Sequence, residues 1–215
     1  MDDVGMVAAG REVPGALDNI RRYCGLTWSR GSDETWAWRY FDVVPTEEDD
    51  DVEATDVLCA SALHSALSRA DLTFFHERRR DLGRWLRDVP SGLRLWEVSD
   101  AVFKHLEVLP ATFTDVAPAL LSKVLHRKRP HLIPPLDRHV IDWYRPVTKR
   151  RPAAEAWAPI LRTMREEEAD SERRLLLALA ESTLARELWP DWSAEHPPRI
   201  SWLRMADIAI WMSYR

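Results

Sequence analysis

The sequence predicts a predominantly helical protein that forms one domain or two small lobes. Apolar residues recur at helical spacing along most of the 215 residues, and prolines mark the ends of several of these segments. The chain has only seven glycines, with neither a Gly-rich phosphate loop nor a dinucleotide-binding fingerprint. With 46% hydrophobic and 30% charged residues, the composition is that of a folded globular domain.

In the first third of the chain, the sequence predicts a helix over residues 14–23, directly from Pro14. Residues 35–44 are rich in aromatic side chains and fit either a strand or a helix. Residues 45–54 carry an acidic run and are expected to form an exposed, mobile loop. Thr55 suits the N-cap of the helix that follows.

Three amphipathic segments come next. Residues 71–88 are expected to form one long helix. A second helix begins at Ser99 and ends before Pro110. The third covers roughly 115–128, where Pro118 is tolerated only in the first turn.

The second half of the chain is also expected to be helical. Pro134 and Pro135 fix an extended segment, and Asp137 stands where a helix over 137–144 would begin. The remaining expected segments are a basic loop at 145–152, helices near 153–168 and 171–188, a Trp- and Pro-rich connection over 189–198, and a closing helix over 200–213.

Charge is distributed unevenly along the chain. The net charge is −5, yet residues 123–151 hold nine basic side chains and only two acidic ones. A basic region on an acidic protein indicates either a contact to a polyanion or a solvated face.

The segment Ser122–Val140, SKVLHRKRPHLIPPLDRHV, carries the most specific pattern. Its Pro-x-Asp-x-His-Val element, residues 135–140, resembles the helix-hairpin-helix DNA glycosylase superfamily. The segment is also similar to a bacterial family of unknown function with a Lys-x-Leu-His-x-Lys-Arg-Pro…Pro-x-x-Asp pattern. The glycosylase resemblance implies an all-α, two-lobed helical bundle that spans residues 1–215 as one domain. The stretch 109–113 departs from that family, because it lacks the hairpin glycines that let backbone amides approach a phosphate.

The resemblance also implies an activity, the hydrolysis of the N-glycosidic bond of a flipped base, with Asp137 as the catalytic carboxylate. A carboxylate next to the sugar stabilises the positive charge of the transition state or activates water. The basic residues assigned to the DNA backbone are Lys123, Arg127, Lys128, Arg129, Arg138, Lys149, Arg150 and Arg151. The side chains assigned to the base pocket are Trp36, Trp38, Tyr40, Trp143, Tyr144 and His139.

We expect a monofunctional glycosylase, because the lysine that forms a Schiff base in bifunctional members lies further upstream than Lys123. The expected partner is double-stranded DNA with a damaged or modified base. Two roles are open for such a glycosylase. One is DNA repair by base excision; the other, suggested by the divergence of this sequence from the repair enzymes, is antiviral defence by removal of a hypermodified phage base. Two alternatives remain open: a DNA-binding module without catalysis and a helical protein-interaction domain.

Several of these residues also have plain structural interpretations. Asp137 suits an N-cap, and basic residues at 123–129 suit a helix C-terminus. Arg204 and Asp207 pair locally in the closing helix, unless Asp207 reaches a cleft. The histidines at 126, 131 and 139 match no metal-ligand spacing, so no metal and no cofactor are expected. Without a signal peptide or an apolar spanning run, we expect a cytoplasmic monomer that does not enter a membrane.

Overall fold

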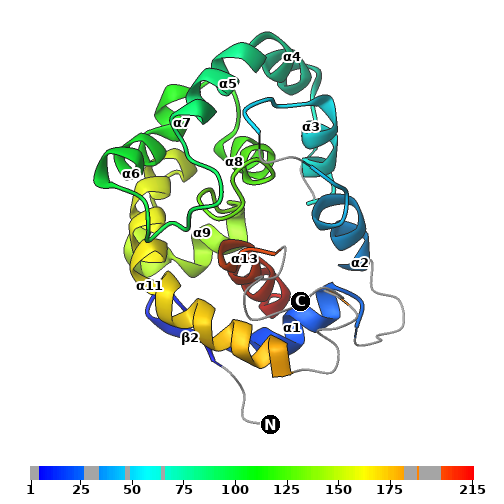
Figure 1. The fold of residues 1–215 in the computed structure, drawn as a ribbon, viewed down its shortest axis with the longest axis vertical. Helices are drawn as coiled ribbons and strands as arrows, with labels where there is room; N and C mark the ends of the chain where they lie inside the picture. Colours follow the sequence, from blue (N-terminus) through cyan, green and yellow to red (C-terminus); the bar gives the residue numbers. More distant parts are fainter. Residues whose placement is uncertain (1–4, 27–33, 47–48, 64–65, 182–187, 189–199) are drawn as a thin grey trace.

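The computed structural model is mostly helical, which confirms the all-α class (Figure 1). It describes residues 5–26, 34–46, 49–63, 66–181, 188 and 200–215. The predicted Trp- and Pro-rich connection and the end of the predicted helix 171–188 lie almost entirely outside the described residues.

The first half of the chain forms a short hairpin and a series of short helices. These are β1 (Met6–Ala8), β2 (Arg11–Val13), α1 (Ala16–Tyr23), α2 (Glu34–Ala37), the π-helix η1 (Trp38–Asp42), α3 (Ala54–Ser61), α4 (Arg69–Glu77), α5 (Arg79–Arg87) and α6 (Asp100–Glu107). The second half contains α7 (Leu109–Thr112), α8 (Pro118–His126), α9 (Arg138–Trp143), α10 (Arg145–Thr148), α11 (Ala153–Glu181) and α13 (Trp202–Ser213).

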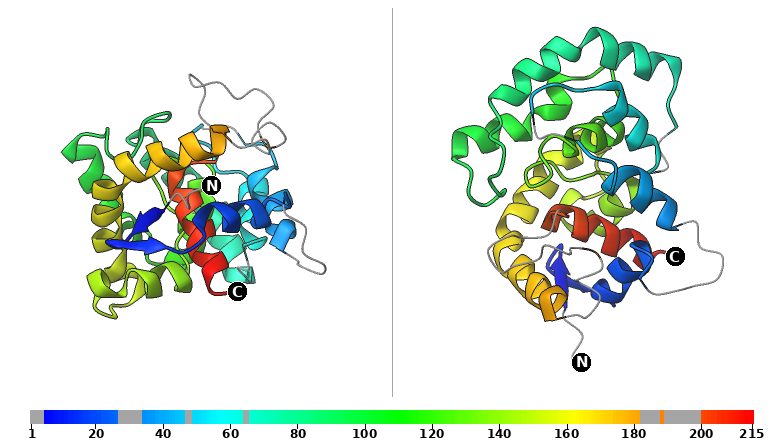
Figure 2. Two further views of the ribbon diagram at one scale, coloured as in Figure 1. Left: turned by 90° about the horizontal axis from the view of Figure 1, so that it is seen from below. Right: turned by 45° about the vertical axis from the view of Figure 1, so that its right-hand side comes forward.

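Helices α3 to α7 form one end of the molecule, and α1, the hairpin and the end of α11 form the other (Figure 1). The two strands pair antiparallel, with Met6 opposite Val13; β1 packs against α11, and β2 contacts α13 (Figure 2). Helices α8, α9 and α13 lie between the two ends. Buried apolar residues from both ends belong to one continuous cluster.

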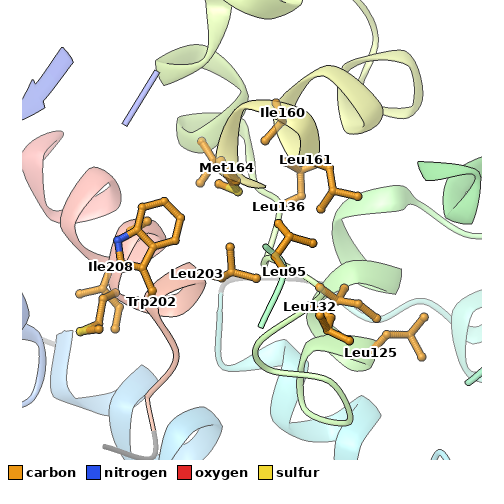
Figure 3. Packing of buried hydrophobic residues seen from close by; sticks show 14 of the residues in the cluster. Leu95, Leu125, Leu132, Leu136, Ile160, Leu161, Met164, Trp202, Leu203 and Ile208 are labelled. Atoms are coloured by element: carbon orange, nitrogen blue, oxygen red, sulfur yellow. The ribbon is translucent and has the colours of Figure 1, made fainter. Parts of the chain in front are cut away.

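The centre of this cluster joins three parts of the chain that are distant in sequence: α8 with the extended segment that follows it, α11 and α13 (Figure 3). Leu125 and Leu136 come from α8 and the extended segment, Leu161 from α11, and Leu203 from α13; all four are fully buried. Burying each such side chain contributes about 1.5–3 kcal/mol to folding. This packing fixes α8 and α13 on either side of the start of α9.

Three helix starts follow the sequence signals. Ser99 accepts a hydrogen bond from the Val102 amide, and Ser201 accepts one from the Arg204 amide. Pro118 lies in the first turn of α8, where its missing N–H costs nothing. Glu53, rather than Thr55, caps α3, and it forms a capping box with Asp56.

Three further predictions of local structure were wrong, and one element was missed. The helix over 71–88 is interrupted at Arg78, whose backbone leaves the helical region, and it forms α4 and α5. The two helices over 153–188 are one continuous helix through residue 181, because no strong helix breaker stands near 169–170. The hairpin at 6–13 was not predicted, and the basic loop contains the one-turn helix α10.

The acidic loop is held by specific contacts. Asp51 pairs with Arg79, and Val52 is buried. Gly83 lets the loop approach α5 closely, because a Cβ there would lie 2.8 Å from the Asp50 carbonyl oxygen.

Candidate functional site

A small pocket lies where α1, α2, α8, α9 and α13 converge. Polar and charged side chains line one part of it, and apolar side chains line the rest. The lining residues are Tyr23, Ala37, Leu63, Lys123, Asp137, Arg204, Asp207, Ile208 and Trp211. Its volume of about 20 Å³ has room for about one water molecule.

Asp137 enters this pocket from the start of α9. Its Oδ1 accepts hydrogen bonds from the amides of His139 (2.8 Å) and Val140 (2.9 Å), so Asp137 is the N-cap of the helix. The buried prolines Pro134 and Pro135 precede it. Within the described part of the chain, Oδ2 forms no hydrogen bond, which leaves one carboxylate oxygen available to a molecule in the pocket.

Lys123 reaches the pocket from the last turns of α8. Its Nζ donates to the carbonyl oxygen of Leu63 at 2.9 Å, and the side chain is buried. Burial lowers the pKa of Lys123, while the carboxylates of Asp207 and Asp137 act in the opposite direction. A buried amine therefore lies in the same pocket as the carboxylate of Asp137.

Arg204 holds the opposite wall together. Its Nε lies 2.7 Å from Asp42 Oδ1, and its Nη2 lies 2.9 Å from Asp42 Oδ2, so the pair is bidentate. Nη1 contacts Asp207, and Nη2 also contacts the Tyr23 hydroxyl. Tyr23 in turn donates to Asp42 Oδ2 at 2.7 Å. This network fixes the Asp207 carboxyl group beside the pocket.

Asp207 and Asp137 have different environments. Burial raises the pKa of Asp207 to about 7, although Arg204 opposes the shift. Asp137 instead lies at a helix N-terminus, where its Oδ1 accepts two backbone N–H groups. Two carboxyl groups with such different surroundings are suited to act as an acid and a base.

The structure corrects the assignment of four basic residues to a DNA backbone. Lys123, Arg127, Lys128 and Arg129 are all buried, so their charges cannot face a phosphate chain. Arg127 contacts Asp56 and the carbonyl oxygen of Phe41, and Lys128 Nζ lies 3.0 Å from Asp56 Oδ2.

Arg129 is likewise buried and paired within the protein. Its Nη2 contacts Asp50 Oδ1, and its Nε donates to the Val89 carbonyl at 2.6 Å. Arg127, Lys128 and Arg129 are therefore paired with buried or neighbouring acids. The other four assigned residues, Arg138, Lys149, Arg150 and Arg151, are exposed.

The aromatic residues assigned to the base pocket divide into two groups. Trp36 and Tyr40 are 53% and 46% exposed, and their ring centroids lie 3.9 Å apart on the segment that contains Ala37. Trp38 packs partly buried against Tyr23, with centroids 6.3 Å apart, and His139 packs against Tyr214. None of these four lines the pocket itself.

Trp143 and Tyr144 belong to the core, which contradicts their assignment to a base pocket. The Trp143 indole donates to the Ala8 carbonyl at 2.9 Å, and Arg11 stacks on its ring. The buried Tyr144 hydroxyl donates to Glu167. Both side chains connect α9 to the hairpin and α11, away from Asp137.

Sequence analysis missed Tyr23 and Trp211 as pocket residues and left Asp207 open. A signal was present in α13, where Arg204 and Asp207 interrupt an otherwise apolar helix and Trp211 follows one turn later. For Tyr23 the sequence gives no such signal, because helical spacing marks it only as part of the apolar face of α1.

The stretch 109–113, compared above with a hairpin, forms the one-turn helix α7 with Leu109 and Pro110 buried. The described residues contain no group of three or more His, Cys, Asp or Glu side chains that could hold a metal ion. No helix among them combines the length and apolar character needed to cross a membrane.

The chain belongs to a family of unknown function, DUF6308, whose model matches residues 16–214. The matched range includes every residue that lines the pocket. No curated protein and no solved structure matches the chain.

Proposed function

We propose that the protein is a monofunctional DNA glycosylase that hydrolyses the N-glycosidic bond of a damaged or modified base. One observation carries the proposal: a backbone-fixed carboxylate, Asp137, shares a water-sized pocket with a second carboxyl group, Asp207. The likeness of residues 135–140 to helix-hairpin-helix glycosylases supports the same chemistry.

In this proposal Asp137 Oδ2 orients and deprotonates a water molecule, or stabilises the positive charge on the sugar. Asp207, whose pKa of about 7 keeps much of it protonated at neutral pH, supplies a proton toward the leaving base. The pocket has room for the attacking water but not for a base, so the flipped nucleotide would bind at the mouth.

The exposed residues near the mouth suit such a substrate. The Trp36–Tyr40 pair offers an aromatic face for an unpaired base, because Ala37, between them in sequence, lines the pocket. Arg138 directly follows Asp137 and is exposed, so it would contact a phosphate next to the target nucleotide.

A lyase is the second candidate, and Lys123 is the observation that favours it. An enclosed amine with a lowered pKa is the kind of group that attacks a sugar carbon and forms a Schiff base. The hydrogen bond to Leu63 would have to break for that attack. Borohydride trapping of the protein on DNA separates the candidates: a trapped adduct that Lys123→Met abolishes indicates the lyase.

The test of the glycosylase is base release measured by mass spectrometry. Purified protein is incubated with DNA that carries uracil, alkylated, oxidised, hydroxymethylated or glucosylated bases. We expect one class of base to be released by the wild type and not by Asp137→Asn.

Two results would overturn the glycosylase. Salt-dependent DNA binding without release of any base would indicate a binding module. Absence of both would indicate a protein-interaction domain.

A further inference from the structure

A second pocket lies at the far end of α9, separate from the site at Asp137. Its volume is about 400 Å³, and its lining is rich in arginine: Ile141, Asp142, Arg145, Thr148, Arg150 and Arg151. We propose that this pocket binds a phosphate group, with Thr148 at its base and the three arginines around it.

Thr148 is the first reason. The residue is completely buried, yet its hydroxyl has no hydrogen-bond partner within the described part of the chain. An unpaired buried hydroxyl is costly, and most buried polar groups find a partner. A phosphate oxygen in the pocket would supply the missing acceptor.

The charge of the lining is the second reason. Three arginines face one acidic residue, Asp142, which already contacts Arg145. The side chains of Arg150 and Arg151 are exposed and have no acidic partner among the described residues. Guanidinium groups donate paired hydrogen bonds that match the oxygens of a phosphate.

The backbone brings these arginines to the pocket. Lys149 and Arg150 both adopt the left-handed conformation, with φ of 52° and 62°, directly after α10. Two successive non-glycine residues in this region are unfavourable, so the surrounding structure must hold them there. The resulting turn places Arg150 and Arg151 beside Thr148 and Arg145.

The phosphate could belong to a nucleic acid strand or to a small molecule. Helix α9 has six residues and a length of about 9 Å, so the pocket lies within a few nucleotides of Asp137. The nucleic acid source rests on the proposed function, whereas binding of free phosphate does not.

The test uses the full chain, inorganic phosphate and a DNA duplex. Titration calorimetry measures phosphate binding, and fluorescence anisotropy measures DNA affinity across salt concentrations. The variants are Thr148→Val, which keeps the side-chain shape, and the double change Arg150→Gln with Arg151→Gln. The matched control is Arg173→Gln with Arg174→Gln, an exposed pair on α11.

If the pocket binds a free phosphate, we expect saturable phosphate binding that weakens about tenfold in Thr148→Val and more in the double variant, but not in the control. If it binds a DNA phosphate, the slope of log affinity against log salt falls by about one in the double variant only. Equal effects of the control pair, or unchanged binding of both ligands in both pocket variants, would overturn the proposal. Base release is measured in parallel, so that an inactive enzyme with an intact phosphate pocket is recognised.

Discussion

At the scale of single residues, Asp137 has a structural role as the N-cap of α9 and, in the proposed function, a catalytic role as well. One carboxylate oxygen caps α9, and the other has no hydrogen bond within the described residues. The sequence pointed to Asp137 in two ways: its position at a predicted helix start suited an N-cap, and residues 135–140 resemble helix-hairpin-helix glycosylases. It could not identify the groups that face Asp137, because Lys123, Asp207 and Tyr23 arrive from three other helices.

The two roles of Asp137 can be separated by substitution. Asn accepts the same capping hydrogen bonds. The free energy of unfolding of Asp137→Asn should therefore lie within about 0.5 kcal/mol of that of the wild type. Asp137→Ala loses the cap and should be less stable by about 1 kcal/mol. Urea denaturation followed by circular dichroism measures both, and an Asn variant as unstable as the Ala variant would contradict the capping role.

Thr148 provides a second test at this scale. Because its buried hydroxyl is unpaired, Thr148→Val should raise the free energy of unfolding by about 1 kcal/mol in phosphate-free buffer. Thr163, whose hydroxyl contacts the Pro159 carbonyl at 3.1 Å, provides the matched control. Thr163→Val should not raise the free energy of unfolding. A lower free energy of unfolding in Thr148→Val would contradict the prediction, because it would show that the Thr148 hydroxyl already has a hydrogen-bond partner.

At the scale of elements, α8 is joined to α3 and the acidic loop by buried charges. The sequence suggested a basic surface, because Arg127, Lys128 and Arg129 lie together with no acid beside them. Their partners, Asp56 and the loop at 49–50, are more than 70 residues away in sequence. Local charge counting cannot detect such pairs, whereas the helix start at Ser99 and the position of Pro118 in the first turn of α8 are local features and were predicted.

This cluster should contribute strongly to stability. Asp56→Asn leaves Arg127 and Lys128 without their shared buried carboxylate, and we expect a loss of about 3–5 kcal/mol. Asp51→Asn breaks an exposed pair with Arg79 and should cost less than about 1 kcal/mol. Thermal unfolding of the two variants measures the contrast, and similar losses would refute the buried role of Asp56.

At the scale of the whole molecule, four buried groups make the stability depend on pH. Burial raises the pKa of Asp207 to about 7 and that of Glu168 to about 8. Burial lowers the pKa of His126 to about 3 and that of His131 to about 4. The folded acids retain protons that the unfolded chain releases, and the folded histidines reject protons that the unfolded chain binds.

The directions of these pKa shifts predict how the free energy of unfolding changes with pH. Between about pH 4.5 and 6.5 the two effects oppose each other, because the acids favour low pH and the histidines favour high pH. Above pH 6.5 the histidines no longer contribute, so the two acids should lower the free energy of unfolding up to about pH 8. Chemical denaturation across this range measures the fall, which should be smaller in Glu168→Gln; a rise above pH 6.5 would contradict it.

The overall architecture was only partly predictable. Apolar periodicity predicted most helices, because each must bury one face. It could not show that α11 is continuous, or that α13 lies between α1 and α9 (Figure 1). Those features depend on packing between distant segments, such as α13 against α1 and α9.

The most direct test of the central claim is base release by the wild type and Asp137→Asn, measured side by side on the same modified DNA. We expect that the variant remains folded, with a free energy of unfolding within about 0.5 kcal/mol of the wild type, and that it releases no base above background. Release of the same base at the same rate by Asp137→Asn would contradict it.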